Sequence, residues 1–488
     1  MFHPLINRWF QEKYSGMTDA QAQAWPLIAE SRHVLVVAPT GSGKTLTAFL
    51  GAIDNLVRGT WSGPGVKVLY VSPLKALNND IRRNLLAPLA ELRTFFGQNG
   101  QEGQFPPISV QTRSGDTSSE ERRRLVHSPP DILVTTPESL NIMLCSRSGR
   151  GMLGSIRLVI LDEIHALVAS KRGTHLISAV ERLTLLSGEF QRIGLSATVK
   201  PARLVAEWMG GYSCSRAGEL VPRPVAVVES TDERRIQLDI ISVRPPELPP
   251  DTEPGESRDA WWESLANQLV TIIRQHRSTL VFANSRRLTE KVCRYINDSA
   301  GEILAYSHHG SLSKEVRMDV EQRLKDGELR AIVATSSLEL GIDIGSVEKV
   351  ILVQSPFSVA STLQRIGRAN HRVGATSFAE LIPLHGLDLV YCTVLAEQVR
   401  DRRIETLHPV ASPLDVLAQI ILSLTAAEEW PVERLYQFIR TIHPYHELSR
   451  RFFDLTIEML SGRYSDLPVR ELRPRLEADV IAGTVKAR

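Results

Sequence analysis

The sequence predicts an α/β protein with two tandem, doubly wound parallel sheets followed by a mostly helical module. Short apolar segments recur along most of the chain, each closed by a small polar turn, and segments typical of helices lie between them. Alternation of strand and helix favours parallel sheets, whose ligands bind at the carboxyl ends of the strands. This pattern runs twice, on either side of a proline-rich stretch.

The first run contains five segments that we expect to form buried strands. They are VLVVAPTG, VKVLYVSP, DILVTTP, RLVILDEIH and RIGLSAT. Continuous apolar runs of this kind are typical of strands that are covered on both faces. In each segment the polar residues lie at the carboxyl end, where a doubly wound sheet binds its ligands. We predict a first domain over residues 1–225.

The second run begins after RPPELPPDTEPGES, a stretch rich in proline and acidic residues, as an exposed connection or loop would be. The strand segments that follow are STLVFANS, ILAYSHHG, AIVATSSLELGID, KVILVQSP and FAELIPL. We predict a second domain of the same architecture over residues 226–405, with the proline-rich stretch shortly after the domain junction.

The C-terminal part lacks buried strands and contains three segments typical of helices: PLDVLAQIILSLTAAEE, PVERLYQFIRTI and ELSRRFFDLTIEMLSGRY. We predict a mostly helical module over residues 406–488. The last residues, VIAGTVKAR, have the pattern of a strand with no partner. Because unpaired terminal strands are uncommon, we expect the chain to be a fragment of a longer protein.

Composition excludes several classes of protein. The chain has 488 residues, enough for about two to four domains. No apolar run reaches the roughly 18 residues that span a bilayer, and the N-terminus lacks a signal-peptide pattern, so we expect a cytoplasmic protein. The net charge of +2 gives no indication of a polyanionic partner. The four cysteines are far apart and indicate neither disulfides nor a zinc knuckle; they are Cys145, Cys214, Cys293 and Cys392.

The stretch VVAPTGSGKTLTAF, residues 36–49, places two glycines and a lysine between a predicted strand and a predicted helix. In such a loop, backbone N–H groups and the positive end of the helix dipole point into one concavity, which favours an anion. Gly43, Lys44 and Thr45 match the phosphate-loop pattern, whereas Ala38 stands where that pattern begins with glycine. A nucleoside triphosphate is the expected ligand, and a glycine-rich turn with a solvated lysine is the alternative.

Two adjacent carboxylates, Asp162 and Glu163, follow a buried strand about 115 residues after the lysine. This pair suits two tasks: Asp162 would hold magnesium, and Glu163 would orient or deprotonate an attacking water. His165 is expected to be a buried polar contact. Ser196 and Thr198 end the next strand, where their hydroxyls could bind the carboxylates and couple the nucleotide state to the rest of the protein.

The ordered motifs resemble those of superfamily-2 helicases. APTGSGKT, DEIH, SAT and QRIGRANH resemble motifs I, II, III and VI, and SPLKAL, TRSGDT, TTPESL, HHGSLS and ATSSLELGID stand in the remaining positions. The DEIH box together with SPLKAL, TRSGDT and SSLELGID is most similar to the Lhr branch, which is close to the Ski2-like helicases. The resemblance covers nearly the whole chain. It implies two RecA-like domains, the start of a winged-helix domain, and ATP and Mg²⁺ as cofactors. The C-terminal helices could also be a plain packing module.

The resemblance also implies the roles of individual residues in the nucleotide site. Gln21 would recognise adenine, with Phe10 as a stacking partner, and Asp343 would approach the ribose. The loop would comprise Thr40, Gly41, Ser42 and Gly43, with Lys44 and Thr45 on phosphate and magnesium. Gln364, Arg365 and Arg368 would come from the second domain, with Arg368 as the main arginine finger. Asn370 replaces a frequent glycine and His371 a frequent basic residue, so the third contact of this motif stays open.

The remaining motifs would bind a single nucleic-acid strand through its phosphates. By resemblance these residues are Pro73, Lys75, Gly115, Thr136 and Pro137 in the first domain, and Asn284, Ser285, His309, Gly310 and Thr335 in the second. Groups of this kind carry no sequence code, so binding independent of sequence is expected.

The implied function is an ATP-dependent helicase that moves 3′ to 5′ along DNA, with a single strand or a tailed duplex as partner. An ATP-gated clamp and an RNA-remodelling enzyme, acting on RNA or a DNA–RNA hybrid, remain as alternatives. The preference for DNA depends on the Lhr resemblance alone.

Overall fold

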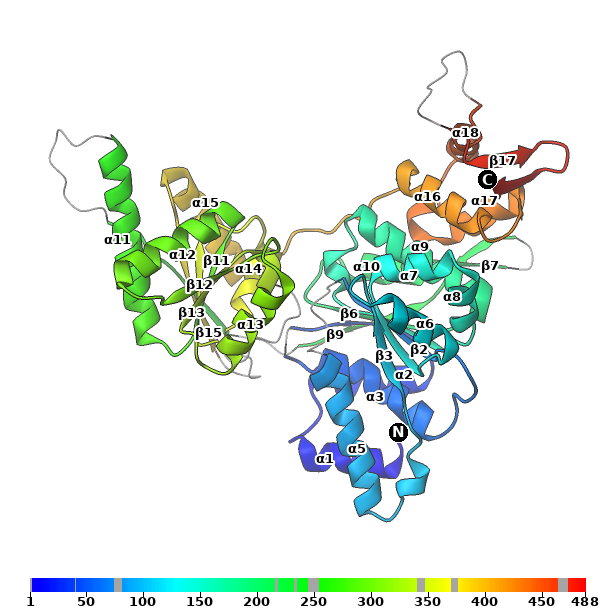
Figure 1. Cartoon of the computed structure of the whole chain (residues 1–488), viewed down its shortest axis with the longest axis horizontal. Helices are drawn as coiled ribbons and strands as arrows, with labels where there is room; N and C mark the ends of the chain where they lie inside the picture. Colours follow the sequence, from blue (N-terminus) through cyan, green and yellow to red (C-terminus); the bar gives the residue numbers. More distant parts are fainter. Residues whose placement is uncertain are drawn as a thin grey trace. The chain divides into compact units, whose positions relative to one another are not determined.

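The computed structural model describes residues 2–39, 41–73, 81–215, 218–231, 235–244, 254–339, 347–369, 376–463 and 473–488 (Figure 1). The chain divides into two compact units. Unit 1 comprises Met1–Ala38, Gly43–Ser230 and Thr406–Arg488, and unit 2 comprises Pro39–Ser42 and Thr231–Glu405. Each unit contains a parallel sheet covered by helices on both faces, which confirms the predicted fold class.

The sheet of unit 1 has seven strands in the order β3-β4-β2-β5-β6-β1-β9, all parallel. Their bounds are β1 His33–Val37, β2 Val68–Val71, β3 Val110–Arg113, β4 Ile132–Thr135, β5 Leu158–Leu161, β6 Gln191–Ser196 and β9 Val225–Glu229. The five predicted strands are confirmed. The two edge strands, β3 and β9, were not predicted. β3, VQTR, is only partly covered and lacks the continuous apolar run of the central strands, whereas β9, VAVVE, has four apolar residues in a row and was overlooked. β9 pairs with β1, begins at the boundary expected at residue 225 and extends four residues past it.

Helices cover both faces of this sheet. Their bounds are α1 Pro4–Lys13, α2 Asp19–Ala29, α3 Lys44–Val57, α5 Ala87–Gln98, α6 Ser119–His127, α7 Pro137–Leu144, α8 Arg147–Met152, α9 Lys171–Ser187 and α10 Ala202–Gly210. Side chains of β1 alternate between the two resulting cores: Val34 and Val36 lie in one, and Leu35 and Val37 lie in the other. A short antiparallel hairpin, β7 Tyr212–Cys214 and β8 Leu220–Pro222, follows α10.

The C-terminal module contains α16 Leu414–Thr425, α17 Val432–Thr441 and α18 Arg450–Leu460, together with a small antiparallel sheet. The sheet order is β16-β18-β17, formed by Trp430–Pro431, Thr484–Ala487 and Leu476–Asp479. The expectation of an unpaired terminal strand was therefore wrong, because β18 has a partner on each side. The partners were missed because both strands are short: β16 has two residues, and β17, LEAD, has four.

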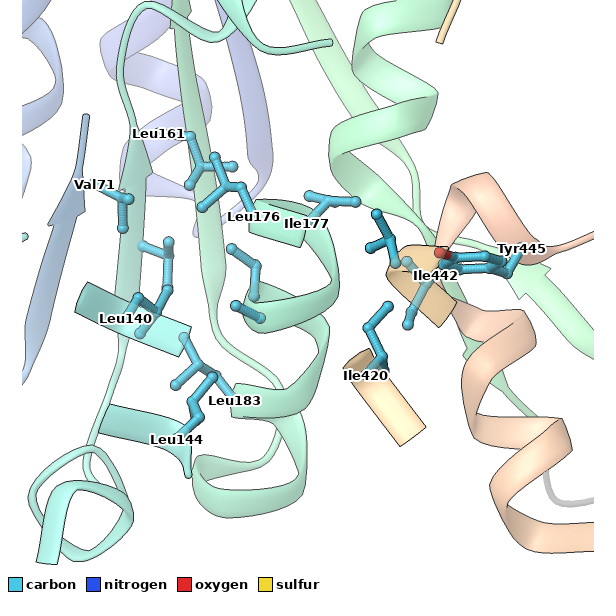
Figure 2. Close-up of a cluster of buried hydrophobic side chains, with 14 of the residues drawn as sticks. Val71, Leu140, Leu144, Leu161, Leu176, Ile177, Leu183, Ile420, Ile442 and Tyr445 are labelled. Atoms are coloured by element: carbon cyan, nitrogen blue, oxygen red, sulfur yellow. The ribbon is translucent and has the colours of Figure 1, made fainter. Parts of the chain in front are cut away.

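The C-terminal module shares a hydrophobic core with the first domain. Figure 2 shows Ile177 of α9 facing Ile442 and Tyr445 of the module, with Ile420 of α16 beside them. All four belong to one cluster of buried side chains that also contains Val71 and Leu161 of the sheet. The module is therefore built onto the helical layer of the first domain, and α16 packs on α9.

The sheet of unit 2 has six parallel strands in the order β10-β15-β14-β11-β13-β12. Their bounds are β10 Arg235–Ile240, β11 Thr279–Ala283, β12 Ala305–His308, β13 Ala331–Ala334, β14 Lys349–Val353 and β15 Thr376–Ile382. The helices are α11 Pro254–Gln275, α12 Arg286–Ala300, α13 Lys314–Lys325, α14 Val359–Ile366 and α15 Gly386–Arg400. The five predicted strands are again confirmed, and the edge strand β10, with its exposed alternate residues, was missed. None of the helices in the described part of the chain is long and apolar enough to cross a membrane.

Candidate nucleotide site and strand path

The loop between β1 and α3 has the backbone of an anion-binding loop. Gly41 and Gly43 have φ values of +82° and +76°, which favour glycine. Gly43 is the N-cap residue of α3, and no side chain caps this helix within the described loop. A Cβ atom on Gly43 would lie 2.8 Å from Nε2 of Gln21, so a larger residue would collide with that amide. The first N–H groups of α3 therefore suit an external anion.

Hydrogen bonds hold the described residues of this loop. The Ser42 hydroxyl donates to the Pro39 carbonyl at 2.7 Å, and the Lys44 ammonium donates to the Ala38 carbonyl at 2.6 Å. Lys44 thus lies over the loop, where it can meet a phosphate. Thr45 is half-buried in the first turn of α3. Thr40 lies outside the described residues.

Gln21 lies beside this loop at the start of α2. The Thr18 N–H donates to Gln21 Oε1 at 3.0 Å, and the Gln21 N–H bonds the Thr18 hydroxyl, which forms a capping box. Gln21 is therefore held where its amide reaches Gly43. Phe10, the expected stacking partner of adenine, is only 6% exposed and packs on Trp25 and Tyr14. This packing makes its ring part of the core.

The two carboxylates follow β5, which is adjacent to β2 in the sheet. The Glu163 N–H donates to Asp162 Oδ1 at 2.8 Å, and the Tyr70 hydroxyl of β2 donates to Oδ2. Burial, followed by the charge of Glu163, raises the pKa of Asp162 to about 6, although the Tyr70 hydrogen bond and Lys44 oppose the rise. Glu163 has a φ of +48°, a backbone conformation that costs a non-glycine residue energy and is often found at functional sites.

His165 connects the DEIH segment, residues 162–165, to the SAT segment, residues 196–198. Its Nδ1 accepts a hydrogen bond from the Ala197 N–H at 3.2 Å and lies 3.4 Å from the Ser196 hydroxyl. The same nitrogen lies 3.5 Å from Glu163 Oε2. The imidazole therefore lies between Glu163 and Ser196. A direct hydrogen bond from the Ser196 hydroxyl to the carboxylates was expected at this place. Thr198 is exposed.

Oxygen ligands for magnesium are present in unit 1. In the part of the chain that the structure describes, no group of three or more His, Cys, Asp or Glu side chains could hold a metal ion. Magnesium usually binds one or two carboxylates together with substrate phosphates and waters, so it does not need such a cage. The Asp162 carboxylate and the Thr45 hydroxyl are the hard oxygen ligands that it prefers.

The arginines of the QRIGRANH segment lie on or just after α14 and are held within unit 2. Arg365 Nε is 3.0 Å from Glu339 Oε2, and its Nη1 donates to Asn284 Oδ1 at 3.0 Å. Arg368 donates twice to the Glu339 carbonyl, at 3.1 and 2.6 Å. Both arginines are buried and Gln364 is half-buried. Asp343, Asn370 and His371 lie outside the described residues.

The strand-path residues of unit 1 follow β2, β3 and β4. Thr136 caps α7, which begins at Pro137, and Gly115 is exposed after β3. Arg172 at the start of α9 joins two of these loops: it donates to the Pro73 carbonyl at 2.8 Å and to the Glu138 carboxylate at 2.5 and 3.1 Å. Lys75 lies outside the described residues.

The strand-path residues of unit 2 follow β11, β12 and β13, which are neighbours in the sheet. Asn284 donates to the Ser355 carbonyl at 2.7 Å, and Ser285 caps α12. Nε2 of His309 lies 3.0 Å from Glu290 Oε1, and the Thr335 hydroxyl accepts from the Ser337 N–H. Gly310 is exposed. These residues therefore gather at the carboxyl edge of the second sheet.

Three family models match successive parts of the chain. Residues 18–205 match the DEAD/DEAH box helicase model, and residues 263–374 match the helicase conserved C-terminal domain. Residues 397–488 match the winged helix domain of the large helicase-related protein. The chain belongs to the Lhr family. This confirms the resemblance, and the match at 397–488 favours a winged-helix domain over a plain packing module.

Curated Lhr proteins resemble the chain over nearly its whole length. It is 41% identical to the Lhr helicase/probable uracil glycosylase of Mycolicibacterium smegmatis, with 100% of this chain and 33% of that protein covered. It is also 41% identical to the ATP-dependent helicase Lhr-Core protein 2 of Thermococcus barophilus, with coverages of 98% and 55%. The chain thus spans about a third to about half the length of these relatives.

Solved structures support the same assignment. The Mycobacterium smegmatis helicase Lhr bound to ssDNA and AMP-PNP matches with a TM-score of 0.88 and 43% identity, covering 100% of this chain and 60% of that one. The DUF1998 helicase MrfA bound to DNA and AMPPNP matches with a TM-score of 0.66 and 20% identity, over 88% and 57% of the two chains, which shows a shared fold. Each unit contains a RecA-like domain.

Three contacts of this Lhr chain were missed by sequence reasoning: those of Tyr70, Arg172 and Glu339. Tyr70 had a detectable signal, because a tyrosine within a buried apolar strand needs a partner for its hydroxyl. Arg172 and Glu339 had none, since their partners are distant in the sequence. His165 was expected to be a buried polar contact, but its bridge to the SAT segment was not foreseen.

Proposed function

We propose that the chain is an ATP-dependent helicase or translocase that moves along single-stranded DNA, in the 3′ to 5′ direction. The observation that supports this most directly is the division of the site. Lys44, Thr45 and the carboxylates belong to the unit that contains the first RecA-like domain, and the arginines belong to the unit that contains the second. Hydrolysis would then require the two domains to close, and this couples ATP to domain movement.

Each predicted residue has a task in this proposal. Lys44 and the N–H groups of the loop, Thr40 included, bind the phosphates, and Gln21 reads the base. Glu163 orients or deprotonates the attacking water, and Arg368 with Arg365 stabilises the charge that develops on the γ-phosphate. When bound by Thr45 and Asp162, magnesium would neutralise phosphate charge. Asp343 and Gln364 complete the nucleotide contacts, and Ser196 and Thr198 couple them to the strand path.

The strand path in this proposal consists of the residues predicted from the motifs. Those in the first domain are Pro73, Lys75, Gly115, Thr136 and Pro137, and those in the second are Asn284, Ser285, His309, Gly310 and Thr335. Hydroxyls, glycines and backbone groups of this kind bind phosphate and sugar, so binding independent of base sequence follows. We further propose the division into residues 1–225, 226–405 and 406–488, and a cytoplasmic location, where a nucleic-acid motor finds its substrate.

The proposal is tested by measuring ATP hydrolysis with no nucleic acid, with a 3′-tailed DNA and with the matched RNA. Strong stimulation by DNA supports the coupled motor. Stimulation by RNA alone would favour the RNA-remodelling enzyme. Stimulation by DNA without ATP-dependent displacement of the tailed duplex would favour the ATP-gated clamp. Absence of hydrolysis under all conditions would refute the proposed activity of this chain.

A further inference from the structure

The N-terminus of α14, the helix that leads to both arginines, is capped from two places in the chain. The Ser358 hydroxyl accepts a hydrogen bond from the Ser361 N–H at 3.0 Å, as an ordinary N-cap does. The two preceding N–H groups are bound by Glu405: Val359 donates to Oε1 at 2.5 Å and Ala360 to Oε2 at 3.2 Å. The first three N–H groups of the helix are therefore all satisfied.

The carboxylate comes from far away in the sequence. Glu405 is 46 residues from Val359, whereas a local capping box would use the third helical residue, which is Ser361 here. A carboxylate that accepts two N–H bonds at the positive end of a helix dipole makes strong, charge-assisted interactions. Glu405 is thus a specific clamp on α14.

Glu405 is also the last residue of unit 2, and the residues that follow it are bound within unit 1. Thr406 forms a parallel bridge with Lys200, and the Leu407 N–H donates to the Lys200 carbonyl at 2.7 Å. Lys200 follows Thr198, the end of the SAT segment, by two positions in the sequence. Glu405, which binds the N-terminus of α14, is therefore joined by one peptide bond to Thr406, which pairs with Lys200 close to the SAT segment.

We propose that Glu405 is a positioning residue for Arg365 and Arg368. Through the Glu405 carboxylate, the connection formed by residues 405–407 controls the placement of α14. Any displacement of this connection relative to unit 2 acts on the helix N-terminus through two hydrogen bonds. Arg365 lies in the last turn of α14 and Arg368 two residues after the helix ends, so the two Glu405 hydrogen bonds govern whether the arginines are aligned for the γ-phosphate. This inference rests on the proposed function, because the arginines act in ATP hydrolysis.

The test compares Glu405→Ala and Glu405→Gln with wild type, and Glu397→Ala serves as the control. Glu397 is an exposed carboxylate on α15, eight residues before Glu405, with no part in the clamp. Hydrogen exchange of the Val359 and Ala360 amides is measured first, without nucleotide. We expect clearly faster exchange at both amides in Glu405→Ala, a smaller change in Glu405→Gln, which keeps one acceptor oxygen, and none in Glu397→Ala.

The second readout is DNA-stimulated ATP hydrolysis together with binding of a fluorescent ATP analogue. Loss of two charge-assisted bonds should lower kcat roughly 5- to 30-fold in Glu405→Ala, with less effect in Glu405→Gln. Nucleotide affinity should stay near the wild-type value, and the melting temperature should fall by only a few degrees, as the loss of a helix cap does. Unchanged exchange or unchanged kcat in Glu405→Ala would overturn the inference, as would an equal loss in Glu397→Ala. If wild type itself shows no hydrolysis, the proposed function fails, and the exchange measurement alone decides whether Glu405 fixes the helix.

Discussion

Replacing Arg172 by alanine should weaken single-strand binding without removing a phosphate contact. Arg172 bonds the Pro73 carbonyl and the Glu138 carboxylate, and so holds together the loop after β2 and the start of α7. The Arg172 and Glu138 side chains are 42% and 54% exposed, so their ion pair contributes only about 0.5–1 kcal/mol. The bond to the Pro73 carbonyl adds about 1 kcal/mol.

The total of about 1.5–2 kcal/mol corresponds to a roughly 10- to 30-fold loss of affinity for single-stranded DNA, if binding requires both loops in place. Fluorescence anisotropy over a range of salt concentrations measures this loss. Because Arg172 positions loops and contacts no phosphate, the slope of log K against log salt should equal that of wild type. A slope smaller in magnitude by about 0.7 would show a direct phosphate contact and refute the reasoning.

Two controls make the Arg172 result specific. Arg203 forms an exposed ion pair with Glu207 on α10, at 3.0 Å, and Arg203→Ala should leave DNA affinity unchanged. In a Glu138→Gln background, Arg172→Ala should cost less than in wild type, because part of the interaction is already lost. Equal losses in both backgrounds would mean that the Glu138 contact does not matter for binding.

Three further predictions follow from the site and the core. Lys44→Ala and Glu163→Gln should each abolish ATP hydrolysis while circular dichroism and melting temperature stay near wild type; retained turnover would refute the site. Gly43→Ala places a Cβ atom 2.8 Å from the Gln21 amide, at a φ of +76° that disfavours alanine. We expect the free energy of unfolding in denaturant to fall by about 1–2 kcal/mol and nucleotide binding to weaken. An unchanged free energy of unfolding would show that this position is not strained. Burial and two nearby arginines lower the pKa of His33 from 6.5 to about 4, so the folded protein resists protonation of this side chain. The free energy of unfolding should therefore fall by up to about 3 kcal/mol as pH drops from 6.5 to 4. His33→Gln should make the free energy of unfolding less dependent on pH, and urea unfolding at several pH values measures this dependence.

The central strands of both sheets could be predicted because their signal is local. β1 and β5, for example, are continuous apolar runs with polar residues at the carboxyl end, and burial on both faces demands such runs. The edge strands β3 and β10 could not be predicted in the same way, because an edge strand is partly exposed and its residues need not be apolar. The edge strand β9, VAVVE, does carry a local apolar run and was overlooked. β18 was expected to have no partner because its two neighbours, the short strands β16 and β17, were missed.

The sequence by itself determined the two α/β domains and predicted the residues that we propose for the chemistry, since phosphate loops and strand-end carboxylates are short local patterns. Only the tertiary structure decided what holds those residues in place. Tyr70 reaches Asp162 across adjacent strands, Arg172 joins two loops, and Glu405 clamps a helix that lies 46 residues before it. The structure also decided that the C-terminal module shares the core of the first domain. Such contacts join residues that are distant in the chain, and they depend on which surfaces meet after folding, which no local pattern of residues records.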